Sequence, residues 1–267
     1  MNPNKKFIAV ALALLIYAVG TLVLTLTLSL QSYRPAGLGQ LSGSTRLPDL
    51  RKIENTAQRK QAFVNQLAPL IEQKNQALIQ LRQELNQARS QLANEQPLTH
   101  VQQKRIERLS RRYKVDAKPP ITTTDIDTLL RRLDALPPSM VLAQAAKESG
   151  WGTSRFARQG NNLFGQWCYT QGCGLVPKNR NSGARHEVQK FSGIEDAINA
   201  YYRNINTHQT YRDVRARRAQ ARKKNTDLSG LDLINGLNGY SSRGAVYVQE
   251  LAQLIRYNDF EKLDASE

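Results

Sequence analysis

The stretch PSMVLAQAAKESGWG, residues 138–152, decides the fold of this 267-residue chain. Its apolar residues occur on nearly every side of a helical projection, which is typical of a helix buried in a protein core. Pro138 suits the first turn of such a helix, and Gly150 suits its C-terminal end. We therefore predict a central buried helix, with the rest of a compact domain packed around it.

Glu148 lies in the last turn of this predicted helix. Within residues 135–194 the only other acidic residue is Glu187. Burial and the partial negative charge of a helix C-terminus both raise the pKa of a carboxyl group, as a general acid requires near neutral pH. The alternative is a structural carboxylate paired with Arg155 or Lys147.

The compact domain is predicted to span residues 119–260. Helical periodicity precedes and follows the central helix, whereas residues 151–191 are rich in glycine, asparagine and aromatic residues. This middle segment predicts loops and a short hairpin, with a strand at 185–191. The expected fold class is mainly α, with a small β-hairpin lobe.

Several side chains after Glu148 suit the binding of a sugar. Trp151 and Phe164 could supply an apolar wall and a stacking face. The neutral groups of Asn161, Asn162 and Gln166 suit hydroxyls and amides.

The N-terminal segment predicts a membrane anchor. Residues 7–30 contain no charged residue and exceed the roughly 20 apolar residues needed to span a bilayer as a helix. We expect a cytoplasmic tail and a single-pass inner-membrane anchor over residues 1–31, a flexible linker over 32–48, and the remainder in the periplasm. A cleaved signal peptide and a buried core helix are the alternatives.

Residues 49–118 predict a long helical stalk. Apolar residues recur there with alternating spacings of four and three, as in heptad repeats. Those of the seam are Ile71, Leu78, Leu81, Leu85, Ala88 and Leu92. We expect either coiled-coil self-association or packing on a partner helix, and the alternative is a solvated spacer.

The two cysteines, Cys168 and Cys173, lie close together in a glycine-rich stretch. Outside the cytoplasm they are expected to form a small-loop disulfide, and two unpaired buried thiols are the alternative. The three histidines have no metal-ligand spacing. We expect neither a metal nor an organic cofactor.

The formal charge of +16 implies an anionic partner or surface. Arginines and lysines crowd residues 212–224, a run that would suit nucleic acid. No helix-turn-helix, zinc-finger or RNP pattern accompanies it, so we expect no nucleic-acid partner. Acidic cell-wall polymer or lipid headgroups fit better, and a solubilising face is the simplest alternative.

Two motifs bear a family resemblance. Residues 141–152, VLAQAAKESGWG, resemble the signature of the bacterial peptidoglycan endo-β-N-acetylglucosaminidases, a glycoside hydrolase 73-like family. Residues 161–165, NNLFG, match that family's second motif. Residues 166–168 and 172–177, QWC and GCGLVP, resemble its Bax-type branch.

The resemblance implies a lysozyme-like domain that hydrolyses β-1,4 bonds next to N-acetylglucosamine in peptidoglycan. It makes Glu148 the general acid and implies a second carboxylate in the β-lobe, for which Glu187 is the candidate. It also implies a functional tyrosine, which fits Tyr247 best and Tyr240 second. The partner of Glu148 is then either Glu187, activating water, or the acetamido oxygen of the substrate assisted by Tyr247.

Two other functions remain open at this stage. A lytic transglycosylase also uses one glutamate followed by serine, although its pattern usually lacks the Gly-Trp-Gly and Asn-Leu-Phe-Gly segments. A non-catalytic scaffold that binds the cell wall is the second alternative.

Overall fold

The computed structural model describes residues 45–178, 180 and 183–264. Most of these residues are helical, as predicted. The α-helices are α2 (Thr56–Ala93), α3 (His100–Arg112), α4 (Thr123–Arg132), α5 (Pro138–Ser149), α6 (Arg155–Gly160), α7 (Ile194–Thr207), α8 (Arg212–Lys223), α9 (Gly230–Leu233) and α10 (Ala245–Tyr257). Short 3-10 turns are η1 (Leu50–Lys52), η2 (Gln209–Tyr211), η3 (Ile234–Gly236) and η4 (Phe260–Leu263).

The predicted membrane anchor, residues 7–30, lies outside the described residues, as does most of the predicted linker, 32–48. Among the helices that the structure describes, none is both long enough and apolar enough to cross a bilayer.

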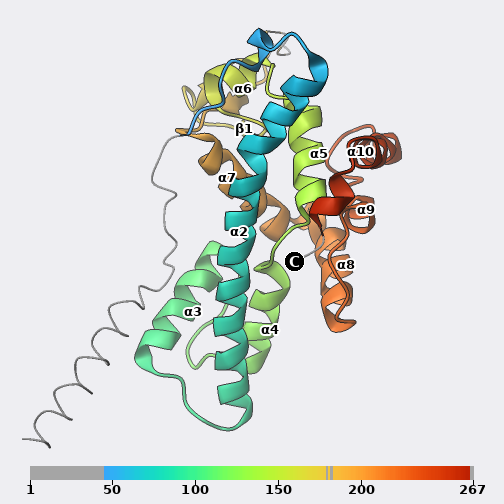
Figure 1. Cartoon of the computed structure of the whole chain (residues 1–267). Helices are drawn as coiled ribbons and strands as arrows, with labels where there is room; N and C mark the ends of the chain where they lie inside the picture. Colours follow the sequence, from blue (N-terminus) through green and yellow to red (C-terminus); the bar gives the residue numbers. More distant parts are fainter. Residues whose placement is uncertain (1–44, 179, 181–182, 265–267) are drawn as a thin grey trace, which may run out of the picture. The chain divides into compact units, whose positions relative to one another are not determined.

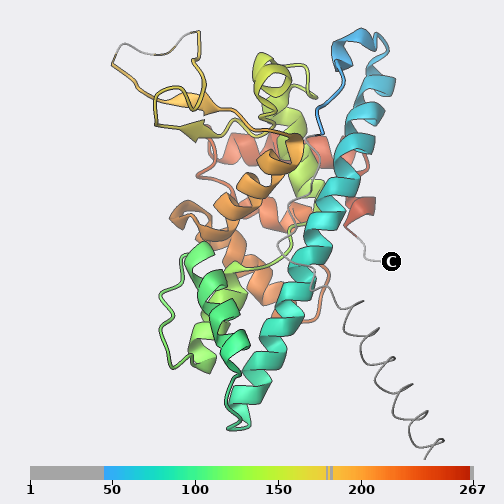
Figure 2. The same ribbon diagram turned by 90° about the vertical axis from the view of Figure 1, so that its left-hand side faces the viewer.

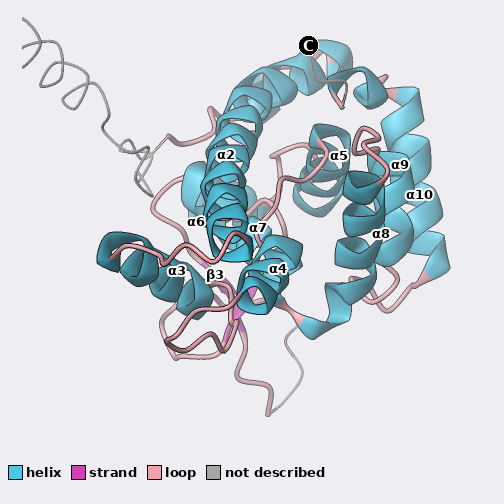
Figure 3. Cartoon of the chain, turned by 90° about the horizontal axis from the view of Figure 1, so that it is seen from below, coloured by secondary structure: helices cyan, strands magenta, loops and turns pink. Residues whose placement is uncertain are grey.

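Helix α5 is the buried central helix that its sequence predicted. All of its residues from Ser139 to Ala146 are buried. Gly150 ends it in a left-handed conformation, with φ 56°. Figure 3 shows α5 between α2 on one side and α8 and α9 on the other, and α5 contacts α2, α9 and α10. The helix that carries Glu148 is thus held from several sides.

Helix α2 corrects the prediction of a separate stalk. It packs along α4, α5 and α7, and Figure 1 shows it running beside them over most of its length. The seam from Ile71 to Ala88 is buried within the same core cluster as α5. The coiled-coil and spacer interpretations are therefore both wrong for this face, because helices of the same chain cover the apolar stripe.

A polar contact fixes the register of α2 against the core. The buried Asn75 amide donates to the Leu136 carbonyl at 2.9 Å and accepts from the Leu136 N–H at 3.1 Å. The hydroxyl of Tyr202 also donates to Asn75 Oδ1, at 2.8 Å. A buried amide that is satisfied this fully specifies one alignment of the helix.

The small β-lobe is a three-stranded antiparallel sheet rather than a simple hairpin. Its strands are β1 (Trp167–Cys168), β2 (Gly174–Leu175) and β3 (Glu187–Gln189), in the order β1-β3-β2. Val188 in β3 pairs with both Trp167 and Leu175. Figure 2 shows this lobe projecting beyond the helices that carry it. The strand predicted at 185–191 contains β3.

The basic run on α8 is partly structural. Arg218 is fully buried, lies 3.6 Å from the Asp134 carboxylate, and donates to Asn206 Oδ1 at 2.7 Å. Arg222 also pairs with Asp134, at 3.0 Å. Burial lowers the pKa of Arg218 to about 10, so the guanidinium remains charged at neutral pH. Arg218 is therefore committed to the core and is unavailable to an external anion, whereas Arg222 stays partly exposed.

The packing of α2 leads to a first prediction. Ile71 is fully buried, whereas Ile79, on the same helix, is 39% exposed. Ile71→Ala should lower the free energy of unfolding by about 2–5 kcal/mol, because it leaves a cavity between α2 and the core. The matched control Ile79→Ala should cost less than about 1 kcal/mol. Urea unfolding of both variants measures this, and equal small effects would mean that α2 is an independent stalk.

Candidate active site

Glu148 is partly buried at the C-terminal end of α5 and has no ion-pair partner among the described residues. The alternative of a structural salt bridge is therefore wrong. Lys147 pairs instead with Glu250, at 2.6 Å, and Arg155 donates to the Val176 carbonyl, at 2.9 Å. A carboxyl group without an ion pair in a partly desolvated place is suited to carry a proton.

A chain of hydrogen bonds holds the Glu148 carboxyl group. The Tyr247 hydroxyl, on α10, donates to Glu148 Oε1 at 2.8 Å. Gln144, one turn before Glu148 on α5, donates its Nε2 to the Tyr247 oxygen at 3.0 Å. The hydroxyl of Tyr201, on α7, donates to Gln144 Oε1. Three helices thus meet in one polar chain inside an otherwise apolar core.

The order of donors in this chain follows from burial. Tyr201 is fully buried, and among the described residues its hydroxyl has Gln144 as hydrogen-bond partner. A buried hydroxyl must donate its proton to some acceptor, so the Gln144 amide presents its oxygen to Tyr201. The Gln144 NH2 group then faces Tyr247. Because the Tyr247 oxygen receives that proton, its own proton points to Glu148.

This arrangement assigns the acidic proton to one oxygen of Glu148. Oε1 accepts from Tyr247, so a neutral Glu148 carries its proton on Oε2. Oε2 lies close to Gly165, where a Cβ would come within 3.6 Å of it. Gly165 is exposed and has a φ of 64°. The proton-bearing oxygen therefore faces a glycine at the protein surface, where a substrate oxygen could approach.

The environment shifts the pKa values of both groups upward. Burial raises the pKa of Glu148, and the hydrogen bond from Tyr247 opposes that rise. Burial, followed by the negative charge of Glu148, holds the pKa of Tyr247 far above its usual range. Tyr247 therefore remains a hydroxyl donor at any pH at which the protein works. Glu148 keeps its proton to a higher pH than a solvated glutamate does.

Tyr240 supports Tyr247. The two rings stack with centroids 5.6 Å apart and planes 6° from parallel. The Tyr240 hydroxyl donates to the Phe164 carbonyl at 2.8 Å. Phe164 is buried, and its ring stacks on Tyr201 at 4.1 Å. The prediction that Phe164 offers a sugar-stacking face is wrong, because its ring is buried against Tyr201. Phe164 and Tyr240 instead hold the segment before Gly165 against the hydrogen-bonded chain.

The two predicted asparagines also hold this turn in place. Asn161 donates to the Phe191 carbonyl at 2.8 Å. The Asn162 amide donates to the carbonyls of Gln166 and Gln189, each at 2.9 Å, and accepts from the Gln166 N–H at 3.1 Å. Their amides are occupied by backbone, so the structure assigns them to the turn rather than to a ligand. Gln166 differs, because its buried Oε1 has no hydrogen-bond partner among the described residues.

Trp151 faces another part of the molecule. Gly150 and Trp151 both have a left-handed φ of 56°, so the chain turns back sharply after α5. The indole packs edge-on against Phe63 of α2, with ring centroids 5.6 Å apart, and against Phe260 at 6.2 Å. The expectation of a stacking face beside Glu148 is replaced by a packing role between α5 and α2.

The Glu187 carboxylate is hydrogen-bonded to backbone N–H groups. Its two carboxylate oxygens accept from the N–H groups of Gly172, at 3.0 Å, and Gly174, at 2.8 Å. These bonds lower its pKa, because they stabilise the charged form. The loop that they hold contains the Cys168–Cys173 disulfide, which confirms the predicted pairing. Among the described residues, Glu187 forms an ion pair with neither Arg185 nor Lys190, its basic neighbours in the sequence.

The cluster of Cys168, Cys173 and Glu187 is the one group of potential metal ligands that the described residues bring together. Its sulfurs are joined in the disulfide and its carboxylate oxygens accept from backbone. Disulfide sulfurs offer no thiolate, so this chemistry does not suit a metal ion.

Sequence reasoning missed three residues of interest. Gln144 and Tyr201 form the far part of the hydrogen-bonded chain, and the signal for Gln144 was a polar residue four positions before Glu148 in an apolar helix. Trp167 is 55% exposed on the β-lobe and stacks on His186 at 4.2 Å. It is an open aromatic face of the kind expected of Trp151.

Three comparisons with known proteins give matches for this chain. The family described as Glucosaminidase: Mannosyl-glycoprotein endo-beta-N-acetylglucosaminidase matches residues 124–260. Protein bax of Escherichia coli (strain K12) is 35% identical over 223 residues, which is 84% of this chain and 77% of that protein. The catalytic domain of the autolysin Auto from Listeria monocytogenes aligns at 20% identity and a TM-score of 0.38, covering 67% of this chain and 97% of that domain. On the first two matches, the chain belongs to the glucosaminidase family.

Proposed function

We propose that this protein hydrolyses β-1,4 glycosidic bonds next to N-acetylglucosamine in peptidoglycan, with Glu148 as the general acid. One observation carries the proposal: an unpaired, partly buried carboxyl group is oriented by Tyr247 so that its free oxygen faces the surface at Gly165. A glycosidase needs such an acid to protonate the leaving oxygen. The family membership supplies the reaction class.

In the proposed reaction the proton moves from Glu148 Oε2 to the glycosidic oxygen as the bond from that oxygen to the anomeric carbon breaks. The acetamido oxygen of the same sugar then bonds to the anomeric carbon. Water opens this intermediate and returns a proton to the Glu148 carboxylate. The Tyr247 hydroxyl stabilises the carboxylate that forms, because its hydrogen bond favours the charged state.

We favour the acetamido group as the catalytic partner of Glu148, over Glu187 as a base that activates water. Both Glu187 oxygens accept backbone N–H groups, and the resulting low pKa makes this carboxylate a weaker base. A loop-holding role accounts for these contacts fully. The acetamido route needs no second carboxylate.

We also propose that the catalytic domain works in the periplasm, tethered by residues 7–30. Two features support this location: the Cys168–Cys173 disulfide, which suits an oxidising compartment, and the uncharged N-terminal stretch.

The first test is Glu148→Gln. This variant should lose at least about 100-fold in the release of soluble products from purified sacculi, because a neutral amide cannot protonate the leaving oxygen. Mass analysis of wild-type products should show N-acetylglucosamine reducing ends. Anhydromuramic ends would identify a lytic transglycosylase instead, and no cleavage by wild type would favour a scaffold.

The stability of Glu148→Gln provides a control for its folding. Because the folded state raises the pKa of Glu148, the free energy of unfolding falls as the pH rises from the ordinary glutamate pKa through the raised one, and the full cost is present above both. A neutral glutamine lacks this cost and can still accept from Tyr247. The urea midpoint at pH 7 should therefore be no lower than that of wild type.

Glu187→Gln tests the choice of partner. If Glu187 only holds its loop, the variant should retain activity within about tenfold of wild type, since a general base contributes about 100-fold or more. Product release from sacculi measures this at several pH values. A loss as large as that of Glu148→Gln, in a variant that keeps its disulfide and unfolds normally, would restore Glu187 as the base.

The hydrogen-bonded chain makes a prediction about pH. In Tyr201→Phe the Gln144 amide is free to turn and accept the Tyr247 proton, which removes a donor from Glu148. The pKa of Glu148 should then rise, and the alkaline limb of the kcat profile should move to higher pH, as in Tyr247→Phe. Tyr202→Phe removes a buried hydroxyl from the adjacent position, where it contacts Asn75, and should leave that limb in place. An identical shift in both variants would contradict the proposed role of the chain.

A further inference from the structure

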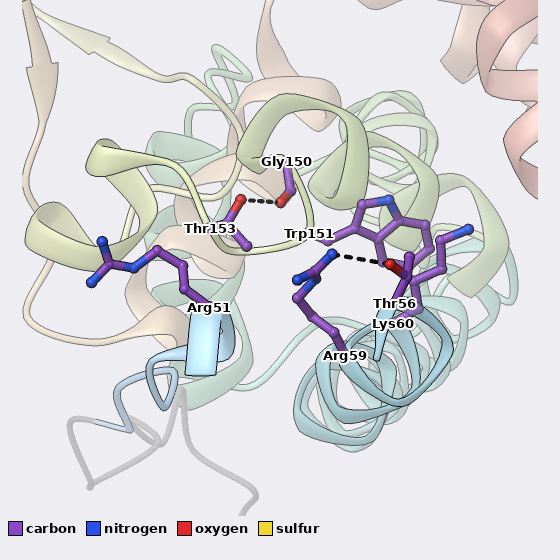
Figure 4. A pocket seen from close by; sticks show the side chains of 7 residues that line it. All are labelled: Arg51, Thr56, Arg59, Lys60, Gly150, Trp151 and Thr153. Atoms are coloured by element: carbon purple, nitrogen blue, oxygen red, sulfur yellow. Dashed lines mark hydrogen bonds between the residues drawn. The ribbon is translucent and has the colours of Figure 1, made fainter. Parts of the chain in front are cut away.

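The turn that follows Glu148 lines a cavity together with the start of α2. Its volume is about 410 Å³, within the range of small-ligand sites. It is lined by Arg51, Thr56, Arg59, Lys60, Gly150, Trp151 and Thr153. Figure 4 shows Arg59 and Lys60 reaching from α2 towards the side of the Trp151 indole. Three cations and no acid line this cavity.

Two of these cations lack a neutralising carboxylate among the described residues. Arg59 donates to the Ile53 carbonyl, at 3.1 Å, and to Thr56 Oγ1, at 3.3 Å. Lys60 donates to Asn258 Oδ1 at 3.2 Å. Arg51 differs, because Asp49 binds it in a bidentate manner at 2.9 and 2.7 Å. The uncompensated charge is therefore concentrated at Arg59 and Lys60.

The surroundings hold these two cations in place. The Lys60 ammonium lies 4.8 Å from the Trp151 ring centroid and 4.9 Å from that of Tyr257. Arg59 and Lys60 both lie in the first turns of α2, whose N-terminus adds positive potential. Charged groups fixed before binding lose little entropy when an anion binds. The cavity is thus prepared for an anion.

Its position links this cavity to the proposed reaction. Gly150 lines it and is two residues from Glu148, so their Cα atoms are at most about 7.6 Å apart. The cationic lining comes from residues 51–60, outside the 124–260 segment that the family match covers. The turn after Glu148 and the segment that contains η1 and the start of α2 thus form this cavity together.

We propose that this cavity binds a carboxylate of the acidic peptide attached to the glycan that Glu148 cleaves, an inference that rests on the proposed function. Guanidinium and ammonium groups recognise carboxylates by charge-assisted hydrogen bonds. Peptidoglycan carries such peptides along its glycan strands. The cavity would then select strands that still bear their peptides.

The test compares the full-length protein with Arg59→Gln/Lys60→Met, in which the methionine keeps an apolar stem against Trp151. The matched control is Arg108→Gln/Lys114→Met, which removes the same charge from exposed positions outside the cavity. The substrates are soluble glycan strands with their peptides, and the same strands stripped by an amidase. The cavity variant should raise KM about tenfold on peptide-bearing strands, without changing kcat. On stripped strands it should match wild type, and the control should match wild type on both.

Direct binding separates the failure of this proposal from that of the proposed function. Calorimetric titration with the peptide released by the amidase needs no cleavage, and should show binding to wild type and to the control but not to the cavity variant. If wild type cleaves neither substrate, the proposed function fails, and the titration still shows whether the cavity binds the peptide. Unchanged KM and unchanged peptide binding in the cavity variant would overturn the inference. If the cavity variant lost binding to anionic phospholipid vesicles but kept binding to the peptide, the inference would also be overturned, in favour of a lipid-headgroup site.

Discussion

The site depends on one constraint: every member of the buried chain Tyr201–Gln144–Tyr247–Glu148 must find a hydrogen-bond partner away from water. The chain has one consistent order of donors, because it ends in a buried hydroxyl at Tyr201 and begins at an acceptor on Glu148. A buried group left without a hydrogen bond would lower the free energy of unfolding by its desolvation cost. The order that satisfies every group is therefore the most stable one. The same contacts join α5, α7 and α10. The packing of these helices and the orientation of Glu148 therefore depend on the same hydrogen bonds.

The two acids of this region show how environment separates their roles. Burial raises the pKa of Glu148, although the hydrogen bond from Tyr247 and the charge of Lys147 oppose the rise. Two backbone N–H groups, from Gly172 and Gly174, lower the pKa of Glu187. The first environment favours the protonated carboxyl group, and the second favours the negative charge that accepts hydrogen bonds from the loop. Two identical side chains in the sequence therefore favour different protonation states in the structure.

Patterns of residues predicted which faces were apolar, but not what covers them. The stripe from Ile71 to Ala88 required an apolar partner. A heptad spacing is compatible with packing against a helix of a second chain or against helices of the same chain. The arginines of α8 carried a similar ambiguity. Arg218 is buried against Asp134, 84 residues earlier in the sequence. Such long-range pairing leaves no local signal, since both residue types are normally exposed.

The sequence by itself determined the mainly helical fold, the buried helix α5, the disulfide and the glucosaminidase family, because these depend on local periodicity, on short spacings and on contiguous motifs. Only the tertiary structure decided that Tyr247 orients Glu148, that Trp151 packs on α2, and that backbone occupies Glu187. Each of these depends on contacts between segments far apart in the chain or on which way a turn aims a side chain. Packing and the need to satisfy buried polar groups make those choices, and no local pattern encodes them.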